Sequence, residues 1–502
     1  MPSIDTDQQI DKNSYLAIRP IFILKIDGSR PIIYPFDYKD TYIHILNPID
    51  GFILSLISGR RTLLEIEELY QKFFPEGNPD QVTATLNYVN GMIRKKQTFS
   101  GIGQDGLIAC STSPMEDAPR YDPRQFVISS DDFEERMSSY KTKRRLEAPV
   151  NALSVFTSRC STNCAYCYAD RQKVQEMSIF RWEKIIAEMH ELGIRLCTPD
   201  NGDIFARKDG IDFLEILLGY GFHFLLSTKC YVSRDWVKRL IKAGFTKKIQ
   251  GLLDRTIQLS IDAVDEEVQR QIYRVPPILP RTMETFDNFS SQGILPRIKA
   301  VITGLNVDQP RKLVDCFYPR GARNFHFVKY IRSFHRHSDE LFLNPEHIES
   351  FKRQYAEIHD LYPDLDCWTD IIPASEAEPQ ELPDREKIWR SRKGCGGGWL
   401  SIGIAPDGKV FLCEQMKMSD EFMVGDLNQQ SILEVWHSQK MLDFIFPDRA
   451  QFKGTICYSC QEFEQCMWER GRCYRDAYYA YGTVYDAPPL CPYNERPWFR
   501  IS

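Results

Sequence analysis

Residues 150–171, VNALSVFTSRCSTNCAYCYADR, decide the fold and the chemistry of this chain. The stretch begins as a short apolar strand and then places Cys160, Cys164 and Cys167 on one tight loop with C-x3-C-x2-C spacing. Three thiolates spaced in this way can hold three irons of a 4Fe-4S cluster and leave the fourth iron open to another ligand. Structural zinc usually takes four ligands, so a zinc site, or three unconnected cysteines, is the alternative.

The residues after this loop alternate between short apolar runs and amphipathic segments. This order indicates βα units and a parallel sheet with right-handed connections, whose reactive groups lie at the carboxyl ends of the strands. The predicted strands are 150–158, 221–228, 256–262, 295–303 and 324–330, and the predicted helices among them are 179–193 and 234–244.

The loop resembles the cluster motif of the radical S-adenosylmethionine (SAM) superfamily, in which an aromatic residue, here Tyr166, precedes the last cysteine. The resemblance implies a partial (β/α)6 barrel and a cluster whose open iron binds SAM, which one electron then cleaves to a 5′-deoxyadenosyl radical. It also implies SAM-binding residues: Asn201, Gly202 and Asp203 for the methionine amino group, Ser260 and Asp262 near the adenosyl moiety, Arg274 for the carboxylate, and Thr303 with Asn306 after the fifth strand. A plain turn at 201–203, and a helix cap followed by a surface arginine, are the alternatives.

Seven further cysteines lie between residues 395 and 491. Seven thiolates exceed the needs of one four-ligand site and nearly fill two. Their spacing, counted with Gly408, is C-x12-G-x4-C for Cys395 and Cys413, and then C-x2-C-x5-C-x6-C-x17-C for Cys457, Cys460, Cys466, Cys473 and Cys491. The pattern resembles the SPASM extension of radical SAM enzymes, except that x6 stands where the family has x3.

The SPASM resemblance implies two auxiliary iron-sulfur clusters. By position, the first would be held by Cys395, Cys413 and Cys473, and the second by Cys457, Cys460, Cys466 and Cys491. The first set lacks an obvious fourth thiolate, for which the isolated Cys367 is one candidate. Glu414 stands where some SPASM enzymes carry an Asp thought to accept a substrate proton, so it is the candidate general base. An exposed glutamate without a role, and a zinc ribbon for the whole block, are the alternatives.

Residues 14–100 have the pattern of a small winged-helix-like α+β domain. The features that predict it are short strands within 16–46, a turn at Gly28 and Ser29, helix caps at Asn47 with Asp50, a capping box at Thr62 with Glu65, and a helix at 80–96. The region resembles the PqqD-like peptide-recognition domain, which implies binding of a leader peptide as an added edge strand. A DNA-binding winged helix is the alternative.

The composition is that of an ordinary globular protein, with 43% hydrophobic and 26% charged residues among 502. A chain of this length buries enough apolar surface to fold without disulfides, so the 15 cysteines need another role. The net charge of −6 argues against nucleic acid as a partner. Neither a signal peptide nor a run of about 18 apolar residues is evident, so we expect a cytoplasmic protein that does not bind membranes. In a reducing compartment, grouped cysteines indicate metal or redox chemistry.

We therefore expect an α/β protein with a radical SAM partial barrel as its centre. The expected parts are a leader-peptide recognition domain at 14–100, a linker with one helix at 101–148, the barrel at 149–340, a bridging region at 341–394 and the SPASM domain at 395–502.

The expected activity is modification of a ribosomally synthesised precursor peptide, a step of RiPP biosynthesis that begins with hydrogen abstraction by the 5′-deoxyadenosyl radical. A flavodoxin or ferredoxin would supply electrons. The product type stays open among thioether and carbon-carbon crosslinks, backbone excision and epimerisation. The alternatives are an enzyme of the same superfamily that acts on a folded protein, as the sulfatase-maturing type does, or on a small metabolite, and a non-enzymatic iron-sulfur scaffold.

Overall fold

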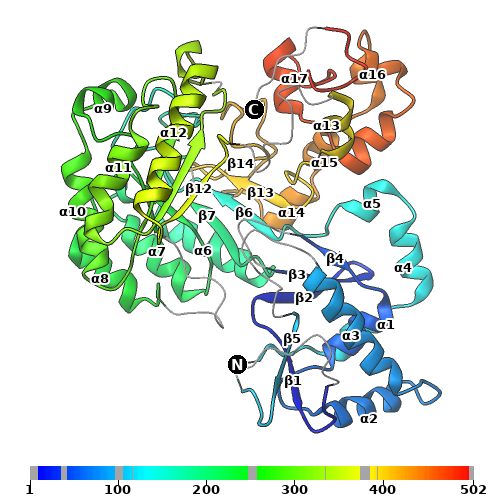
Figure 1. The fold of residues 1–502 in the computed structure, drawn as a ribbon. Helices are drawn as coiled ribbons and strands as arrows, with labels where there is room; N and C mark the ends of the chain where they lie inside the picture. The colour runs from blue at the N-terminus through cyan, green and yellow to red at the C-terminus, as the bar shows by residue number, and fades with distance from the viewer. Residues whose placement is uncertain are drawn as a thin grey trace. The chain divides into compact units, whose positions relative to one another are not determined.

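The computed structural model describes residues 10–35, 42–95, 106–116, 118–199, 201–246, 257–333, 335–372, 385–392 and 394–496. These residues form two compact units, one ending at Ala148 and the other beginning at Pro149 (Figure 1). Each unit has its own hydrophobic core. Within the described ranges, no helix combines the length and the apolar character that are required to cross a membrane.

The first unit contains two small antiparallel sheets. Strand β1 (Tyr15–Ile18) pairs with β5 (Ile108–Ser111), while β2 (Phe22–Asp27) pairs with β3 (Arg30–Pro35), which also pairs with β4 (His44–Ile45). The turn between β2 and β3 contains Gly28, whose φ of +65° few other residues adopt without strain. The hairpin predicted around this turn is therefore present.

Three helices follow these strands in the order that the sequence predicts: α1 (Pro48–Ser55), α2 (Leu63–Phe73) and α3 (Asp80–Lys95). The capping box of α2 is complete, because the Thr62 hydroxyl accepts from the Glu65 N–H while the Glu65 carboxylate accepts from the Thr62 N–H. The Asn47 side chain caps α1 by accepting from the Asp50 N–H at 2.8 Å. Lys96, the last residue of the predicted third helix, lies outside the described residues.

The described part of the segment predicted as a linker has more structure than one helix. It contains β5, the 3-10 helix η1 (Pro123–Phe126), α4 (Ser130–Met137) and α5 (Tyr140–Arg144). Its end is tied to the β2–β3 hairpin by Arg30, which is fully buried, forms a 2.8 Å ion pair with Asp27 and donates at 2.8 Å to the carbonyl of Arg145. A buried ion pair with additional hydrogen bonds holds a defined geometry, so this segment is part of the first unit.

The second unit contains a row of parallel strands. Strands β6 (Asn151–Ser154) and β7 (Leu196–Pro199) are parallel, and a single bridge between Leu196 and His223 leads from β7 toward β8 (Leu226–Thr228). The parallel order then continues through β9 (Ile257–Ser260), β10 (Arg297–Ile302), β11 (Asn324–Lys329) and β12 (Asp366–Thr369). Helices alternate with these strands, so the α/β prediction and its partial barrel are confirmed (Figure 1).

The helices that connect these strands are α6 (Ile179–Glu191), η2 (Ile204–Ala206), α7 (Gly210–Gly219), α8 (Arg234–Lys242), α9 (Glu266–Tyr273), α10 (Leu279–Ser290), α11 (Pro310–Phe317), η3 (Tyr318–Arg320), η4 (Asp339–Leu341) and α12 (Pro345–Leu361). Their apolar faces contribute large, fully buried side chains such as Trp182 of α6 and Phe213 of α7. The barrel core therefore forms as the helical and strand periodicities of the sequence require.

The C-terminal part of the second unit continues the sheet on the other side of β6. Strand β13 (Ser401–Ile404) lies parallel to β6 and begins an antiparallel run with β14 (Lys409–Phe411) and β15 (Gly425–Asp426). The remaining elements are short: α13 (Arg385–Ser391), α14 (Ile432–Trp436), α15 (Gln439–Ile445), η5 (Arg449–Phe452), α16 (Ile456–Ser459), the π-helix η6 (Gln465–Arg470) and α17 (Tyr474–Tyr481). Residues 373–384 of the predicted bridging region lie outside the described residues.

Candidate active site and metal centres

The first cysteine motif lies on the loop that follows the carboxyl end of β6. The Thr162 hydroxyl is 3.4 Å from the sulfur of Cys160 and 3.3 Å from the sulfur of Cys164, so it lies between two of the three thiols. Arg171 donates to the Thr162 carbonyl at 2.6 Å, and the Ser333 hydroxyl donates to the Cys167 carbonyl at 2.6 Å. These bonds tie the backbone of the cysteine loop to the side chains of Arg171 and Ser333.

The same loop docks on the end of α9. The backbone N–H of Asn163 donates to the Tyr273 carbonyl at 2.9 Å, and that of Ala165 donates to the Ile272 carbonyl at 2.8 Å. Between these anchors and the last cysteine, the Tyr166 hydroxyl donates to the carboxylate of Asp262. The structure thus brings together two residues that were predicted from different motifs.

Asp262 lies beneath the cysteine loop. It is fully buried, and its Oδ1 accepts from the backbone N–H of Val301 at 2.8 Å. Asn306 donates to the Asp262 carbonyl at 2.8 Å and accepts from both the N–H and the hydroxyl of Thr303. The weakest motif of the sequence, Thr303 with Asn306, therefore fixes the backbone around Asp262.

The segment 201–203 follows β7 and approaches the cysteine loop closely. Asn201 has a left-handed φ of 68°, and a Cβ on Gly202 would come within 1.9 Å of the Thr157 carbonyl oxygen. Only glycine fits there, because the atom in the way belongs to the backbone.

The Asp203 carboxylate, predicted to bind the methionine amino group of SAM, is instead hydrogen-bonded to groups of the protein. It is buried and accepts from the Thr228 hydroxyl at 2.8 Å and from the backbone N–H groups of Lys229 and Cys230 at 2.9 and 3.1 Å. The carboxylate thereby ties the loop after β7 to the loop after β8. In this conformation the Asp203 carboxylate fixes the positions of the carboxyl ends of β7 and β8 relative to each other.

Ser260 and Arg274 lie at the rim of this site. The Ser260 hydroxyl, at the end of β9, is 2.9 Å from the hydroxyl of Ser227 at β8. Arg274 is exposed and has a left-handed φ of 52° at the end of α9, one residue after the carbonyl that anchors Asn163. The backbone of Arg274 is therefore adjacent to the residue on which the cysteine loop docks, and its side chain is accessible to a ligand.

Sequence reasoning missed Lys229, which directly follows β8. Its ammonium lies 3.7 Å from Asp262 Oδ2, and its side chain is only 12% exposed. The signal that could have found it is its position, since a lysine at the carboxyl end of a parallel strand lies where α/β folds bind ligands.

The C-terminal cysteines form two groups in the structure. The first consists of Cys395, Cys413 and Cys473: the thiol of Cys395 interacts electrostatically with the other two, and the Tyr474 phenol interacts with all three. Burial raises the pKa of the Cys413 thiol to about 12 and also raises that of Cys473. Thiols in such surroundings become thiolates when a metal replaces the proton.

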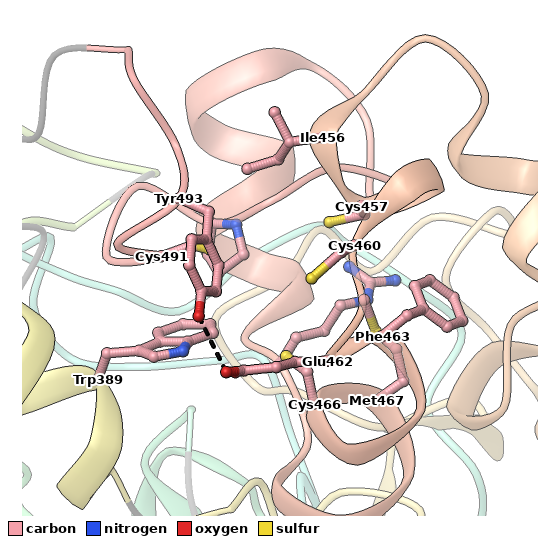
Figure 2. Close-up of a pocket in the computed structure, with 12 residues that line it drawn as sticks. Trp389, Ile456, Cys457, Cys460, Glu462, Phe463, Cys466, Met467, Cys491 and Tyr493 are labelled. Atoms are coloured by element: carbon pink, nitrogen blue, oxygen red, sulfur yellow. Dashed lines mark hydrogen bonds between the residues drawn. The ribbon is translucent and has the colours of Figure 1, made fainter.

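The second group consists of Cys457, Cys460, Cys466 and Cys491, which line one pocket of about 400 Å³ together with Trp389 and Phe463. Figure 2 shows the sulfur atoms of Cys457 and Cys460 directed into the space that the four residues share. Burial raises the pKa of Cys457 to about 12 and that of Cys466 to about 11. The guanidinium of Arg392 donates to the sulfur of Cys466 at 3.3 Å, and the Tyr493 hydroxyl donates to Glu462 at 2.9 Å at the edge of the pocket.

These surroundings fit iron-sulfur clusters. Each C-terminal group offers three or four thiols in an apolar, largely buried space, and a positively charged arginine compensates thiolate charge at Cys466. Among the described residues, no three Cys, His, Asp or Glu side chains are gathered closely enough to hold a single metal ion. A cluster of four irons needs no such convergence, because each sulfur binds a different iron.

Cys367 and Glu414 have different surroundings. Within the described residues, the thiol of Cys367 on β12 interacts with Asp366 and Tyr355 and with none of the grouped thiols. Glu414 is partly buried and follows Cys413, whose pKa it helps to raise. Glu414, unlike Cys367, therefore interacts with a member of the first group.

Two segments of the chain match known families. Residues 154–316 match the radical SAM superfamily, and residues 395–461 match the SPASM iron-sulfur cluster-binding domain. A radical SAM domain binds SAM and a 4Fe-4S cluster, and a SPASM domain binds auxiliary iron-sulfur clusters, so these are the cofactors of this chain.

The chain is also similar to individual proteins. It is 22% identical over 325 residues to the antilisterial bacteriocin subtilosin biosynthesis protein AlbA of Bacillus subtilis, which covers 62% of this chain and 67% of AlbA. It is 22% identical over 359 residues to the PqqA peptide cyclase of Rhizobium meliloti, which covers 70% of this chain and 89% of the cyclase. The crystal structure of Streptococcus suis SuiB bound to S-adenosylmethionine has the same fold, with a TM-score of 0.61, 16% identity, and coverage of 95% of this chain and 100% of SuiB.

Proposed function

We propose that this radical SAM enzyme, with its radical SAM domain at residues 154–316 and its SPASM domain at residues 395–461, modifies a ribosomally synthesised precursor peptide. Three relatives support a peptide substrate. AlbA acts in the biosynthesis of a bacteriocin, the PqqA peptide cyclase acts on a peptide, and SuiB has been solved with its precursor peptide SuiA.

The observation that carries the proposal is the grouping of the ten motif cysteines. They lie in three groups within one compact unit, at positions 160–167, at 395, 413 and 473, and at 457–466 with 491. We assign the first group as ligands of the SAM-binding cluster and the other two as ligands of two auxiliary clusters. When bound, the first cluster supplies the electron that cleaves SAM to the 5′-deoxyadenosyl radical.

The residues around the first group would orient SAM and exclude water. Gly202 lets the backbone approach the cysteine loop, and Asp203 fixes the ends of β7 and β8. Arg274 is exposed beside the loop, where its guanidinium could pair with the methionine carboxylate in bidentate fashion. Ser260 and Asp262 lie at and just after the end of β9, on the side where the adenosyl group would bind.

We assign Glu414 as the general base that takes a proton from the substrate. The partly buried carboxylate follows Cys413 and is close enough to influence that thiol. A substrate radical could then give its proton to Glu414 and its electron to the neighbouring auxiliary cluster. An external flavodoxin or ferredoxin would supply the electron for SAM cleavage.

The first unit would bind the leader of the precursor. In the described residues, the sheet β2-β3-β4 has β2 and β4 at its edges, so an extended peptide could add as a further strand. Ile45 of β4 is 36% exposed and offers an apolar contact for such a strand. This is the PqqD-like role that the sequence of residues 14–100 predicts.

The test is co-expression of the enzyme with each short peptide found to be encoded beside its gene, followed by mass spectrometry of the purified peptide. The proposal expects a mass change that requires the leader and disappears with the Cys160→Ala/Cys164→Ala/Cys167→Ala variant. An enzyme that cleaves SAM and leaves every candidate precursor unchanged, but modifies a folded protein or a metabolite, would contradict a peptide substrate.

A further inference from the structure

Lys229 is a buried cation beside the first cysteine group. Its ammonium lies 3.7 Å from Asp262 Oδ2 and 5.9 and 5.5 Å from the ring centroids of Tyr166 and Tyr273. The side chain is only 12% exposed, whereas lysine side chains are almost always on the surface. Burying an ammonium costs several kcal/mol unless anionic partners compensate, so its partners determine what it does.

Asp262 compensates Lys229 only in part. Its Oδ2 also accepts from the Tyr166 hydroxyl, and its Oδ1 accepts from the Val301 N–H. At 3.7 Å the contact with Lys229 is an ion pair beyond hydrogen-bond distance. Among the described residues the ammonium makes no hydrogen bond, so all three of its N–H donors are available to another anion.

The other anionic groups that Lys229 faces are thiols. After Asp262, the charges that interact most strongly with it are those of Cys164 and Cys160, followed by that of Asp203. Lys229 also acts on Cys164, where its charge opposes the rise in pKa that burial causes. The ammonium therefore lies beside the Asp262 carboxylate and 5.9 Å from the ring centroid of Tyr166 on the cysteine loop, and it interacts electrostatically with two of the three thiols of that loop.

We infer that Lys229 is a positioning residue for the SAM-binding cluster: its ammonium, held by Asp262, places a fixed positive charge beside Cys160 and Cys164 and raises the reduction potential of the cluster they hold. The inference rests on the proposed ligand role of these cysteines. One electron from an external one-electron donor enters on reduction, no bond forms or breaks, and Lys229 keeps its proton in both states. Because the reduced cluster carries one more negative charge, a nearby cation stabilises it relative to the oxidised cluster.

The test is a redox titration of the reconstituted enzyme followed by electron paramagnetic resonance (EPR). The signal of the SAM-binding cluster is obtained by comparison with the variant that lacks Cys160, Cys164 and Cys167. For Lys229→Met we expect the equilibrium constant of one-electron reduction to fall about tenfold, which is about 59 mV for a one-electron couple. Lys229→Arg keeps the charge and should stay near the wild-type potential.

A matched control is Lys312→Met. Lys312 also pairs with aspartates, at 2.6 Å to Asp265 and 3.1 Å to Asp308, but it is 43% exposed and lies on α11. Its removal should leave the potential unchanged. If Lys229→Met does not retain the cluster, Lys229→Gln, which keeps a polar side chain without the charge, is titrated in its place.

A second readout separates this role from direct binding of SAM. SAM affinity measured by equilibrium dialysis should change less than threefold in Lys229→Met. Unchanged potentials in the uncharged variants, with or without a large loss of SAM affinity, would overturn the inference. A wild-type enzyme that has no SAM-binding cluster would instead contradict the proposed function.

Discussion

The carboxylate of Asp170 accepts a 2.9 Å hydrogen bond from the backbone N–H of Met418, across 248 positions of the chain. Asp170 lies three residues after Cys167, and Met418 lies five residues after Cys413. This bond therefore joins the loop of the first cysteine group to the loop of the first C-terminal group. His335 lies at the same junction, where it interacts with the Asp170 carboxylate and with the backbone of Met416.

Removing this bond should loosen the junction. Asp170→Ala leaves a partly buried N–H without its acceptor, which costs about 1–3 kcal/mol of unfolding free energy. We also expect more 5′-deoxyadenosine to be released per modified peptide, because a looser junction between the two cysteine groups should uncouple radical formation from peptide modification. Denaturant unfolding and product counting by mass spectrometry measure both effects.

The control Asp420→Asn removes an ion pair with Lys409 in which the aspartate is 87% exposed, and should change stability by less than about 0.5 kcal/mol. If Asp170→Ala and Asp420→Asn had the same unfolding free energy and released the same amount of 5′-deoxyadenosine per modified peptide, the Asp170 hydrogen bond would not stabilise the junction.

Gly202→Ala should disrupt SAM binding. The added Cβ would lie 1.9 Å from the Thr157 carbonyl, so the loop after β7 must move away from the cysteine loop. A misplacement of about 1 Å at a reacting site can cost about 100-fold in rate, and we expect a loss of that order in SAM cleavage. Gly219→Ala is the matched control, because no atom lies within 4 Å of its added Cβ. Normal SAM cleavage by Gly202→Ala would mean that the segment 201–203 is not part of the site.

Removal of residues 1–148 should separate peptide modification from SAM cleavage. A cut at residue 100 would leave β5 without its partner β1, so the cut is placed at the boundary of the unit. We expect uncoupled SAM cleavage to continue and leader-dependent modification to be lost. Proline placed in the pairing segment of the leader should likewise weaken binding to the intact enzyme, because proline lacks the N–H that pairs with an edge strand. A truncated enzyme that modifies the full-length precursor at the original rate would refute the leader-binding role.

The two candidate ligand positions for the first auxiliary cluster should differ. Cys473→Ala removes a thiol that interacts with Cys395, and should lower the iron content by up to one cluster. Cys367→Ala removes a thiol whose partners are Asp366 and Tyr355, and should leave the iron content at the wild-type value. Iron and sulfide analysis with EPR distinguishes the variants. Loss of a cluster in Cys367→Ala would show that this cysteine is the missing ligand after all.

Much of the fold follows from local patterns in the sequence. The capping box of Thr62 with Glu65 and the Gly28 turn are local hydrogen-bond and φ requirements, and the structure contains both. The sequence does not predict the strand β5, because its partner β1 lies about 90 residues earlier and four residues give no clear period. The sequence therefore predicts a linker at 101–148, because the distant pairing of β5 leaves no local pattern there.

The candidate site could be predicted only where ligands share a motif. The cysteine spacing, together with the resemblance to the radical SAM and SPASM families, predicted the three groups of cysteines that the structure contains. Lys229 was missed because its role depends on Asp262, which is 33 positions away, and no spacing rule connects them. Asp203 was found, but its bonds to the N–H groups of Lys229 and Cys230 could not be read from a motif.

The most direct test of the central claim is SAM cleavage by the anaerobically reconstituted enzyme and by the Cys160→Ala/Cys164→Ala/Cys167→Ala variant. The wild-type enzyme should hold close to three clusters and release 5′-deoxyadenosine when reduced. The triple variant should release none while keeping the iron of its two C-terminal groups, because those thiols lie on separate loops. Undiminished 5′-deoxyadenosine formation by the triple variant would contradict the assignment of this loop as the radical-generating site.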